Sequence, residues 1–430
     1  MGSTLCAEMY TFFFWSYFVR IEVFHCIMSF MNMDEAVKRH EAITEELVTY
    51  LKEDEELKAL FETSIAKGKV INPDPDTNPI ACIEDYLDLI DRCVKGLPWT
   101  FTPSKKYSSL YMRIDQSMGI MYYVIDQPLV ELEGKGYYHP SLIHHEPIRS
   151  WFYKLVKQIG SFLDEEASWS KEYYELAKGE EDFHLNDDLY EDPANWHCFN
   201  DFFSRRLKDK SLRPIAFKDD THVIVSPADA IVQGLWQIDE NGRIMEKNED
   251  YQKGLSIKTG TLCDVAVFLD DEKYGKYFAG GTLTHTFLDI YEYHRYHFPI
   301  SGKIIDVKKI PAAATPGGVI TWDEQQGRYK EFFSEVFGWQ SLETRGVILM
   351  EDSFGHHMAI CPLGMCQVAS VNFETDVIPG KIVQKGDPMG YFLYGGSDIV
   401  MIFEKDAGFA LSHEKGTKLL AGQEYGTIRG

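Results

Sequence analysis

The spacing of apolar residues changes near residue 196, and this change constrains the fold most. Over residues 34–163 apolar side chains recur every three or four positions, which places one apolar stripe on each of several helices; examples are Ile43, Leu47 and Leu51, and Leu110, Ile114 and Met118. After Trp196 short apolar runs alternate with turn residues, a pattern typical of strands. The sequence therefore predicts an α+β protein with a helical N-terminal domain and a β-rich domain after it.

Composition shifts divide the chain into three segments. Residues 1–33 are predicted to form an apolar extension or a weak anchor, because Arg20, Glu22 and His25 interrupt a stretch too charged for a good spanning helix. An interfacial helix is a further alternative. We favour an upstream extension before a start at Met31 or Met33, because an ordinary helix pattern begins immediately afterwards. Residues 34–192 are predicted to be a helical domain that ends in an acidic linker, and residues 193–430 a β-rich domain.

The charge balance excludes some partners. Lys and Arg number 43 against 67 Asp and Glu, which gives a formal net charge of -24. Such a chain repels the phosphates of nucleic acid and gains nothing from an anionic membrane surface. The eight cysteines show no C-x-x-C spacing, which favours reduced thiols. We therefore expect no nucleic-acid partner, a cytoplasmic location, and at most weak, peripheral contact with a membrane.

Three short segments could carry chemistry, although each is ambiguous alone. Residues 226–230 read Ser-Pro-Ala-Asp-Ala, in which Asp229 could simply cap a turn. Residues 293–302 contain His294 and His297 beside an arginine, and these could be metal ligands, an acid/base pair or core residues. Residues 394–398 read Tyr-Gly-Gly-Ser-Asp, which alone resembles an ordinary loop.

Together, and in this order, the three segments resemble the phosphatidylserine decarboxylase family of pyruvoyl enzymes. The resemblance extends over about residues 199–409, and the histidine segment is its most specific part. It implies that the chain cleaves itself between Gly396 and Ser397 and that Ser397 becomes a covalent pyruvoyl cofactor. It implies no metal. The adjacent histidine pairs His144-His145 and His356-His357 lack a third ligand at a known spacing and are interpreted as structural.

The resemblance also assigns roles. Asp229 is expected to orient a histidine that activates Ser397, as in other Ser-His-Asp sites. We expect His297 to be the processing base and His294 to be the acid/base of decarboxylation, although the resemblance does not settle which is which. The ketone made from Ser397 is expected to form a Schiff base with the substrate amine, so that the α-carboxylate leaves as CO2. The cleaved large and small chains should stay associated.

The substrate is less constrained than the reaction. The family implies conversion of phosphatidylserine to phosphatidylethanolamine. The helical domain is similar to the one that precedes the catalytic part of soluble fungal L-tryptophan decarboxylases, so a free, aromatic L-amino acid is the alternative. An unprocessed lipid-binding or scaffold protein is a remote one.

Two positions depart from the family pattern. Ala230 replaces a glycine, and Asp398 replaces the Thr or Ser that follows the processing serine. A carboxylate at Asp398 is expected to oppose the oxyanion that develops during cleavage.

Overall fold

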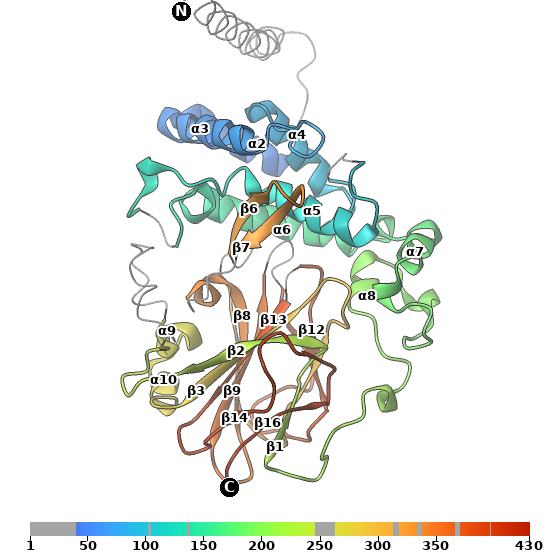
Figure 1. Ribbon diagram of the computed structural model, residues 1–430, viewed down its shortest axis with the longest axis vertical. Helices are drawn as coiled ribbons and strands as arrows, with labels where there is room; N and C mark the ends of the chain where they lie inside the picture. The colour runs from blue at the N-terminus through green and yellow to red at the C-terminus, as the bar shows by residue number, and fades with distance from the viewer. Residues whose placement is uncertain are drawn as a thin grey trace, which may run out of the picture.

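The computed structural model of the protein describes residues 40–101, 105–135, 138–245, 263–312, 318–332, 338–365, 370–395 and 397–430. Helices form the N-terminal part and strands dominate the remainder, so the α+β prediction is confirmed (Figure 1). The apolar segment 1–33 lies outside the described residues. Within the described ranges, no helix combines the length and the apolar character needed to cross a bilayer.

The helical part contains the helices that the apolar spacing predicts: α2 (Ala42–Glu53), α3 (Glu55–Ile71), α4 (Ile83–Val94), α5 (Leu110–Tyr123) and α6 (Ile148–Leu163). A further helix, α7 (Lys171–Lys178), lies in the acidic segment that was predicted to be a linker. Their stripes face one core, in which Leu47, Phe61 and Trp151 are buried. Local side chains fix where some helices begin: Asp54 accepts a hydrogen bond from the Leu57 N–H at the start of α3, and Ser109 accepts one from Met112 at the start of α5.

An antiparallel sheet of eight strands forms the centre of the β-rich part. Its order is β11-β5-β8-β9-β13-β3-β2-β15. The strands are β2 (Ala230–Gln237), β3 (Thr282–Leu288), β5 (Gly302–Ile310), β8 (Thr344–Glu351), β9 (His357–Gly364), β11 (Ile382–Val383), β13 (Ser397–Phe403) and β15 (Lys418–Leu419). Every residue of β13 is buried, because β9 and β3 flank this strand and both of its faces are covered.

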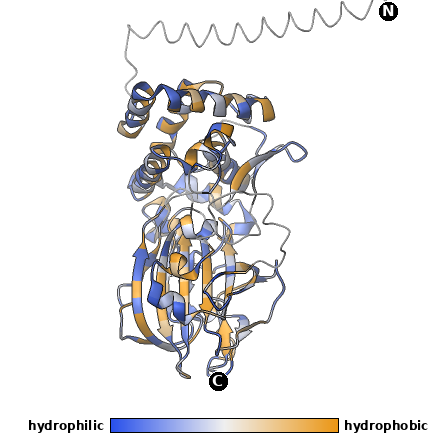
Figure 2. Cartoon of the chain, turned by 90° about the vertical axis from the view of Figure 1, so that its left-hand side faces the viewer, coloured by the Kyte–Doolittle hydropathy of each residue, from blue (hydrophilic) through white to orange (hydrophobic). Residues whose placement is uncertain are grey.

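The two faces of the sheet pack against different cores. Alternate side chains of a strand point to opposite faces, and β13 sends Ile399 and Met401 into one core and Val400 and Ile402 into another. The second core includes residues of two short helices, α9 (Val265–Leu269) and α10 (Glu272–Tyr277). Apolar residues, orange in Figure 2, accordingly run along the central strands.

Two three-stranded sheets complete this part and carry two of the three motifs. One has the order β1-β16-β14, with β1 (Val223–Val225), β14 (Ala410–Leu411) and β16 (Glu424–Thr427). The other has the order β10-β12-β4, with β4 (Arg295–His297), β10 (Asn372–Phe373) and β12 (Pro388–Tyr391). The turn containing Asp229 follows β1, and β4 holds the second histidine.

A hairpin from the β-rich part packs among the helices. It consists of β6 (Val319–Asp323) and β7 (Arg328–Phe332) and lies beside α5 (Figure 1). Gln116 of α5 donates to the carbonyl of Tyr329 at 2.9 Å and accepts from its N–H at 2.6 Å, while the Tyr329 hydroxyl donates to the Thr77 carbonyl at 2.8 Å. The boundary at residue 193 stays a prediction, and in space the later segment contributes to the core of the earlier one.

Candidate active site

Ser397 is the first residue of β13 and is fully buried. It lies opposite Leu288 of β3 and Gly364 of β9, and its hydroxyl donates to the carbonyl of Gly395 at 3.3 Å. Gly395 has φ of 148°, a backbone conformation that favours glycine. Gly396, the predicted residue before the cleavage point, lies outside the described residues. The serine therefore stands where a sharp loop enters the centre of the sheet.

His294 is a buried, neutral base with one ring nitrogen unused. Its Nδ1 lies 2.9 Å from the carbonyl oxygen of Glu292. Because a carbonyl only accepts, Nδ1 carries the hydrogen, and Nε2 keeps its lone pair. That buried Nε2 has no hydrogen-bond partner in the described part of the chain. Burial, helped by the nearby Arg205 charge, lowers the pKa of His294 to about 3.

An aromatic layer connects His294 to the serine loop. The His294 ring stacks on Phe203 of α8 (Phe199–Phe203), with ring centroids 3.9 Å apart. Phe203 in turn meets the edge of Tyr394, three residues before Ser397, at 5.5 Å. The backbone reinforces this connection, since the Phe392 N–H donates to the His294 carbonyl at 2.9 Å. His294 and the serine loop are therefore held in one packed unit.

His297 is half-buried and is also neutral. Its Nδ1 donates to the Gly386 carbonyl at 3.2 Å, and its Nε2 accepts from the Tyr293 hydroxyl at 3.2 Å. Burial lowers the pKa of His297 to about 4, while the hydrogen bond to Gly386 and the negative charge of Asp229 act in the opposite direction. Its backbone N–H donates to the carbonyl of Pro227, in the same turn as Asp229, at 2.7 Å.

Asp229 is held mainly by Arg213. The guanidinium Nε lies 3.0 Å from Asp229 Oδ1, and a second nitrogen bonds Oδ2. The N–H of Ala421 also donates to Oδ1, at 2.8 Å. Both carboxylate oxygens are thus used, and Asp229 influences His297 through its charge and through the shared turn. The sequence did not single out Arg213 as a functional residue, although the Arg213-Pro214 pair precedes the motif closely.

The four predicted catalytic residues lie in one region but are not linked by direct hydrogen bonds. Among the described residues, no hydrogen bond joins Ser397 to His294 or His297, and none joins Asp229 to either histidine. The pairing of β4 with β12, and the short connection from β12 to Ser397, bring the histidine strand to the serine loop. The roles of the four side chains stay predictions.

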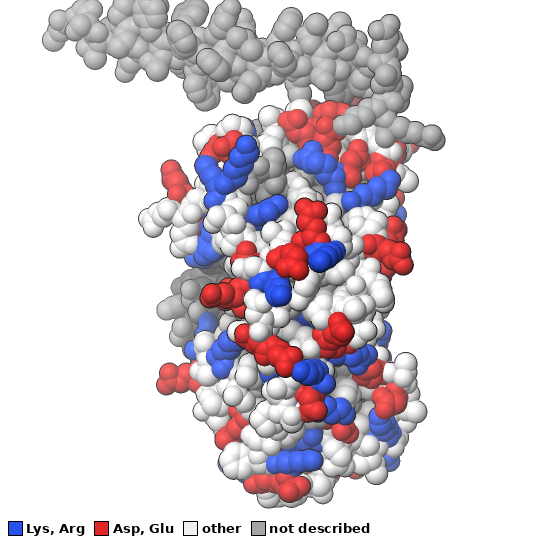
Figure 3. All heavy atoms as spheres, turned by 90° about the vertical axis from the view of Figure 1, so that its right-hand side faces the viewer, with Lys and Arg blue, Asp and Glu red and all other residues white. Residues whose placement is uncertain are grey.

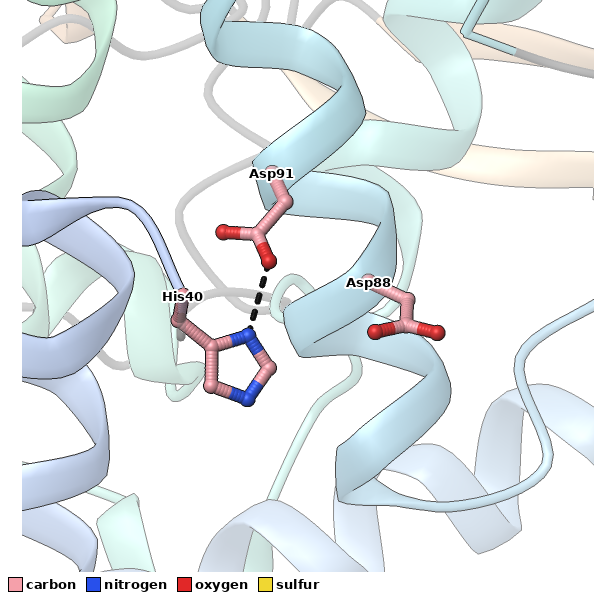
Figure 4. Close-up of side chains that lie close together, drawn as sticks. All are labelled: His40, Asp88 and Asp91. Carbon is pink, nitrogen blue, oxygen red and sulfur yellow. Dashed lines mark hydrogen bonds and ion pairs between the residues drawn. The ribbon is translucent and has the colours of Figure 1, made fainter. Parts of the chain in front are cut away.

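The other histidines have separate environments. His356 and His357 bind different carboxylates, Asp352 and Glu404. His144 is buried in the helical part, where burial lowers its pKa to about 4. A cluster of three potential ligands also lies in the helical part: His40, Asp88 and Asp91 (Figure 4). The hydrogen bond of 2.7 Å between His40 Nδ1 and Asp91 accounts for the orientation of this histidine, and the cluster is not part of the region around Ser397.

Charged side chains of both signs lie on the surface. On the face drawn in Figure 3, Lys and Arg side chains are interspersed with Asp and Glu, and we see no continuous basic tract among the described residues there.

Comparisons with known proteins agree with this arrangement of motifs. The phosphatidylserine decarboxylase family model matches residues 199–427. The phosphatidylserine decarboxylase proenzyme of Ruminiclostridium cellulolyticum is 31% identical over 238 residues, which cover 53% of this chain and 69% of that protein. The proenzyme of Clostridium novyi is 28% identical over 310 residues, 66% of this chain and 91% of that protein.

The match to another relative is shorter in proportion. Phosphatidylserine decarboxylase proenzyme 3 of Schizosaccharomyces pombe is 33% identical over 225 residues, and the chain spans only 20% of that protein. The region matched by the family model contains Asp229, His294, His297 and Ser397. Since the shared region covers more than half of the sequence, the chain belongs to the phosphatidylserine decarboxylase family of carboxy-lyases.

Proposed function

We propose that this protein is a self-cleaving, pyruvoyl-dependent decarboxylase that converts phosphatidylserine to phosphatidylethanolamine. One observation carries the proposal: Ser397 is buried at the head of a central strand, behind a glycine with positive φ, and a neutral histidine with an unused Nε2 is packed one aromatic ring from its loop. A serine that serves only as a loop residue does not need this burial.

Maturation is proposed to begin at the serine hydroxyl. Ser397 Oγ loses its proton to a base and attacks the Gly396 carbonyl, so that the amide becomes an ester. Loss of the Ser397 α-proton breaks the Cβ–O bond, which leaves Gly396 with a free carboxylate and residue 397 as dehydroalanine. Addition of water and release of ammonia then convert residue 397 to the pyruvoyl group.

His297 is our candidate for the processing base. It is neutral at physiological pH and can accept a proton, and Asp229 favours the protonated form through its charge. Arg213 fixes Asp229 in turn, so this arginine acts through Asp229 and His297. The Tyr293 hydroxyl that now donates to His297 Nε2 must release it before the serine can use it.

His294 is our candidate for the proton donor and acceptor in decarboxylation. The pyruvoyl ketone supplies an electrophile for the substrate amine and an electron sink for the bond that breaks. His294 suits proton transfer because its Nε2 is unused and Nδ1 is fixed by the Glu292 carbonyl.

A mass measurement tests self-cleavage. Purified protein should contain a large chain that ends at Gly396 and a small chain, residues 397–430, with a blocked N-terminus. Ser397→Ala should remain a single inactive chain, whereas Ser161→Ala, on the exposed face of α6, should cleave as the wild type does. Recovery of only the 49.5 kDa chain after long incubation at neutral pH would contradict the proposal.

Two further measurements test the chemistry. His294→Ala should cleave but decarboxylate ~10²–10⁴-fold more slowly, whereas His297→Ala should cleave slowly. The opposite result would exchange the two roles. Hydroxylamine, which traps ketones, should inactivate the mature enzyme, and dialysis against EDTA should not.

A free L-amino acid is the second candidate substrate. The helical part contacts the region around Ser397: the Tyr111 hydroxyl of α5 lies 3.4 Å from Asp289, which follows the residue opposite Ser397, and Tyr394 belongs to the helical core. This proximity of the added helical part to the serine loop is the observation that favours the second candidate. Assays with phosphatidylserine micelles beside a panel of L-amino acids, including tryptophan, distinguish the two.

A further inference from the structure

Asp398, the residue after Ser397, forms a buried hydrogen bond that the sequence did not reveal. Its Oδ2 lies 2.8 Å from Nε2 of His285, a residue of the neighbouring strand β3. The two side chains are 1% and 6% exposed, respectively. Histidine and carboxylate therefore form a pair inside the sheet, immediately beside the proposed cleavage point.

The pair lies on the face of β13 away from the serine side chain. Ser397, Ile399 and Met401 alternate with Asp398, Val400 and Ile402 along the strand, so the two sets point to opposite faces. The carboxylate is thus directed away from the Ser397 hydroxyl. This placement differs from the expectation that Asp398 would act directly on the developing oxyanion.

His285 is the side-chain partner that keeps Asp398 there. A buried carboxylate is costly unless it is hydrogen-bonded and its charge is compensated. The second oxygen, Oδ1, is buried without a hydrogen-bond partner in the described part of the chain, so the contact to His285 is the hydrogen bond on which the carboxylate relies there. Trp236 and Trp339 flank the imidazole, with ring centroids 6.3 and 5.8 Å away, and limit its movement.

We propose that His285 is a positioning residue for maturation: it holds the Asp398 carboxylate on the far face of β13 and compensates its charge, so that Ser397 can react with a carboxylate as its neighbour. The proposal rests on the self-cleavage proposed above. It explains how a chain with Asp at this position could still process itself. Without His285, the carboxylate would either stay buried and uncompensated or turn towards solvent and distort the head of the strand.

A suppressor experiment tests this role. The wild type, His285→Ala, Asp398→Thr and the double variant are made by cell-free translation, and appearance of the small chain is followed on denaturing gels. His285→Ala should slow cleavage by about tenfold or more, because it leaves a buried charge without its partner. Removing that charge should restore the reaction, so the double variant should cleave at the rate of Asp398→Thr alone.

A second histidine–carboxylate pair supplies the matched control. His357 of β9 bonds Glu404, just beyond the other end of β13, at 2.9 Å. His357→Ala should lower thermal stability without changing the cleavage rate. If His285→Ala fails to fold by circular dichroism, His285→Gln replaces it, and its remaining defect should again disappear on addition of Asp398→Thr.

Several outcomes would overturn the proposal. If His285 only fills space between the tryptophans, the double variant will stay as slow as His285→Ala. Cleavage of His285→Ala at the wild-type rate would also contradict it. A wild-type chain that never cleaves would refute the proposed function itself, whereas a cleaving wild type with no rescue in the double variant would refute only the role of His285.

Discussion

The helical part and the β-rich part are stabilised by contacts of different range. In the helical part, side chains a few residues apart form the caps and share the apolar stripes, as Asp54 does with Leu57. Around the sheet, residues distant in sequence make the decisive contacts, and His285 and Asp398 are 113 positions apart. The β6–β7 hairpin joins the two parts, because Tyr329 packs in the helical core. The helices can therefore form from local signals, whereas the region around Ser397 forms only when distant segments of the chain have come together.

The largest expected effect follows from removing the anchor of that hairpin. Tyr329→Ala deletes a buried ring whose centroid lies 4.9 Å from that of Tyr123. The Tyr329 side chain also packs directly against Gly119 of α5. Loss of a large buried aromatic side chain should lower the free energy of unfolding by ~3–5 kcal/mol. Urea denaturation should show this loss. If the hairpin couples the two parts, the variant should also unfold in two separate transitions, one for each part.

The hydroxyl of Tyr329 provides a matched control. Tyr329→Phe keeps the ring and loses only the hydrogen bonds of the hydroxyl, so it should cost ~1 kcal/mol. Two results would argue that the two parts are not coupled through this residue. One is an equal loss of unfolding free energy in both variants, and the other is a single urea-unfolding transition for Tyr329→Ala that is the same as in the wild type.

An intermediate effect is expected from acid. Because burial lowers the pKa of His294 to about 3, the folded protein does not take up a proton there when the unfolded chain does, below its ordinary pKa of about 6.5. The contribution of His294 to the free energy of unfolding is therefore fully present above pH 6.5 and is lost as the pH falls towards 3. Between pH 6.5 and 5 the free energy of unfolding should fall by ~2 kcal/mol because of this group.

Replacing the histidine tests that pH dependence. In His294→Gln the free energy of unfolding should fall less steeply between pH 6.5 and 5, by the same ~2 kcal/mol. The exposed His197, changed to Gln, serves as the control and should leave the slope as in the wild type. Parallel slopes for all three proteins would show that His294 takes up a proton as readily in the folded state as in the unfolded chain.

The smallest effect concerns the interface between the two parts. Burial, together with the charge of Asp289, raises the pKa of Asp115 on α5 to about 6. The ionised form is therefore disfavoured in the folded state, and stability is lost as the pH rises from about 4 through 6. Asp115→Asn should raise the free energy of unfolding by ~1 kcal/mol at pH 7.5 and by less at pH 4.5. Glu62→Gln, on the exposed face of α3, should show no such difference.

Much of this molecule could be predicted from its sequence because the relevant signals are periodic. The stripes that contain Leu47 and Ile114 are buried where the spacing put them, and the change to strands after Trp196 is present. The motifs around Asp229, His294 and Ser397 indicated the family. Spacing carries no information on contacts between distant segments, so Arg213 as the partner of Asp229 was not foreseen. His285 gave no signal because it lies in an ordinary alternating strand.

The hairpin shows a similar limit. Residues 319–332 form the strands β6 and β7, but nothing in their sequence indicates that Tyr329 enters the core of the helical part. That position depends on a complementary Gln116, 213 residues away.

The position of β13 between β9 and β3 has a consequence for reversibility. If the bond before Ser397 breaks as proposed, the first strand of the small chain is already enclosed by two strands of the large one. The fragments then cannot exchange between molecules without dismantling the sheet. After unfolding, the two fragments must reassociate before they can refold. Refolding of the mature form is then a second-order reaction, which dilution slows. Cleavage would thus give the enzyme hysteresis: the precursor can refold on its own, and the mature form persists only as long as it stays folded.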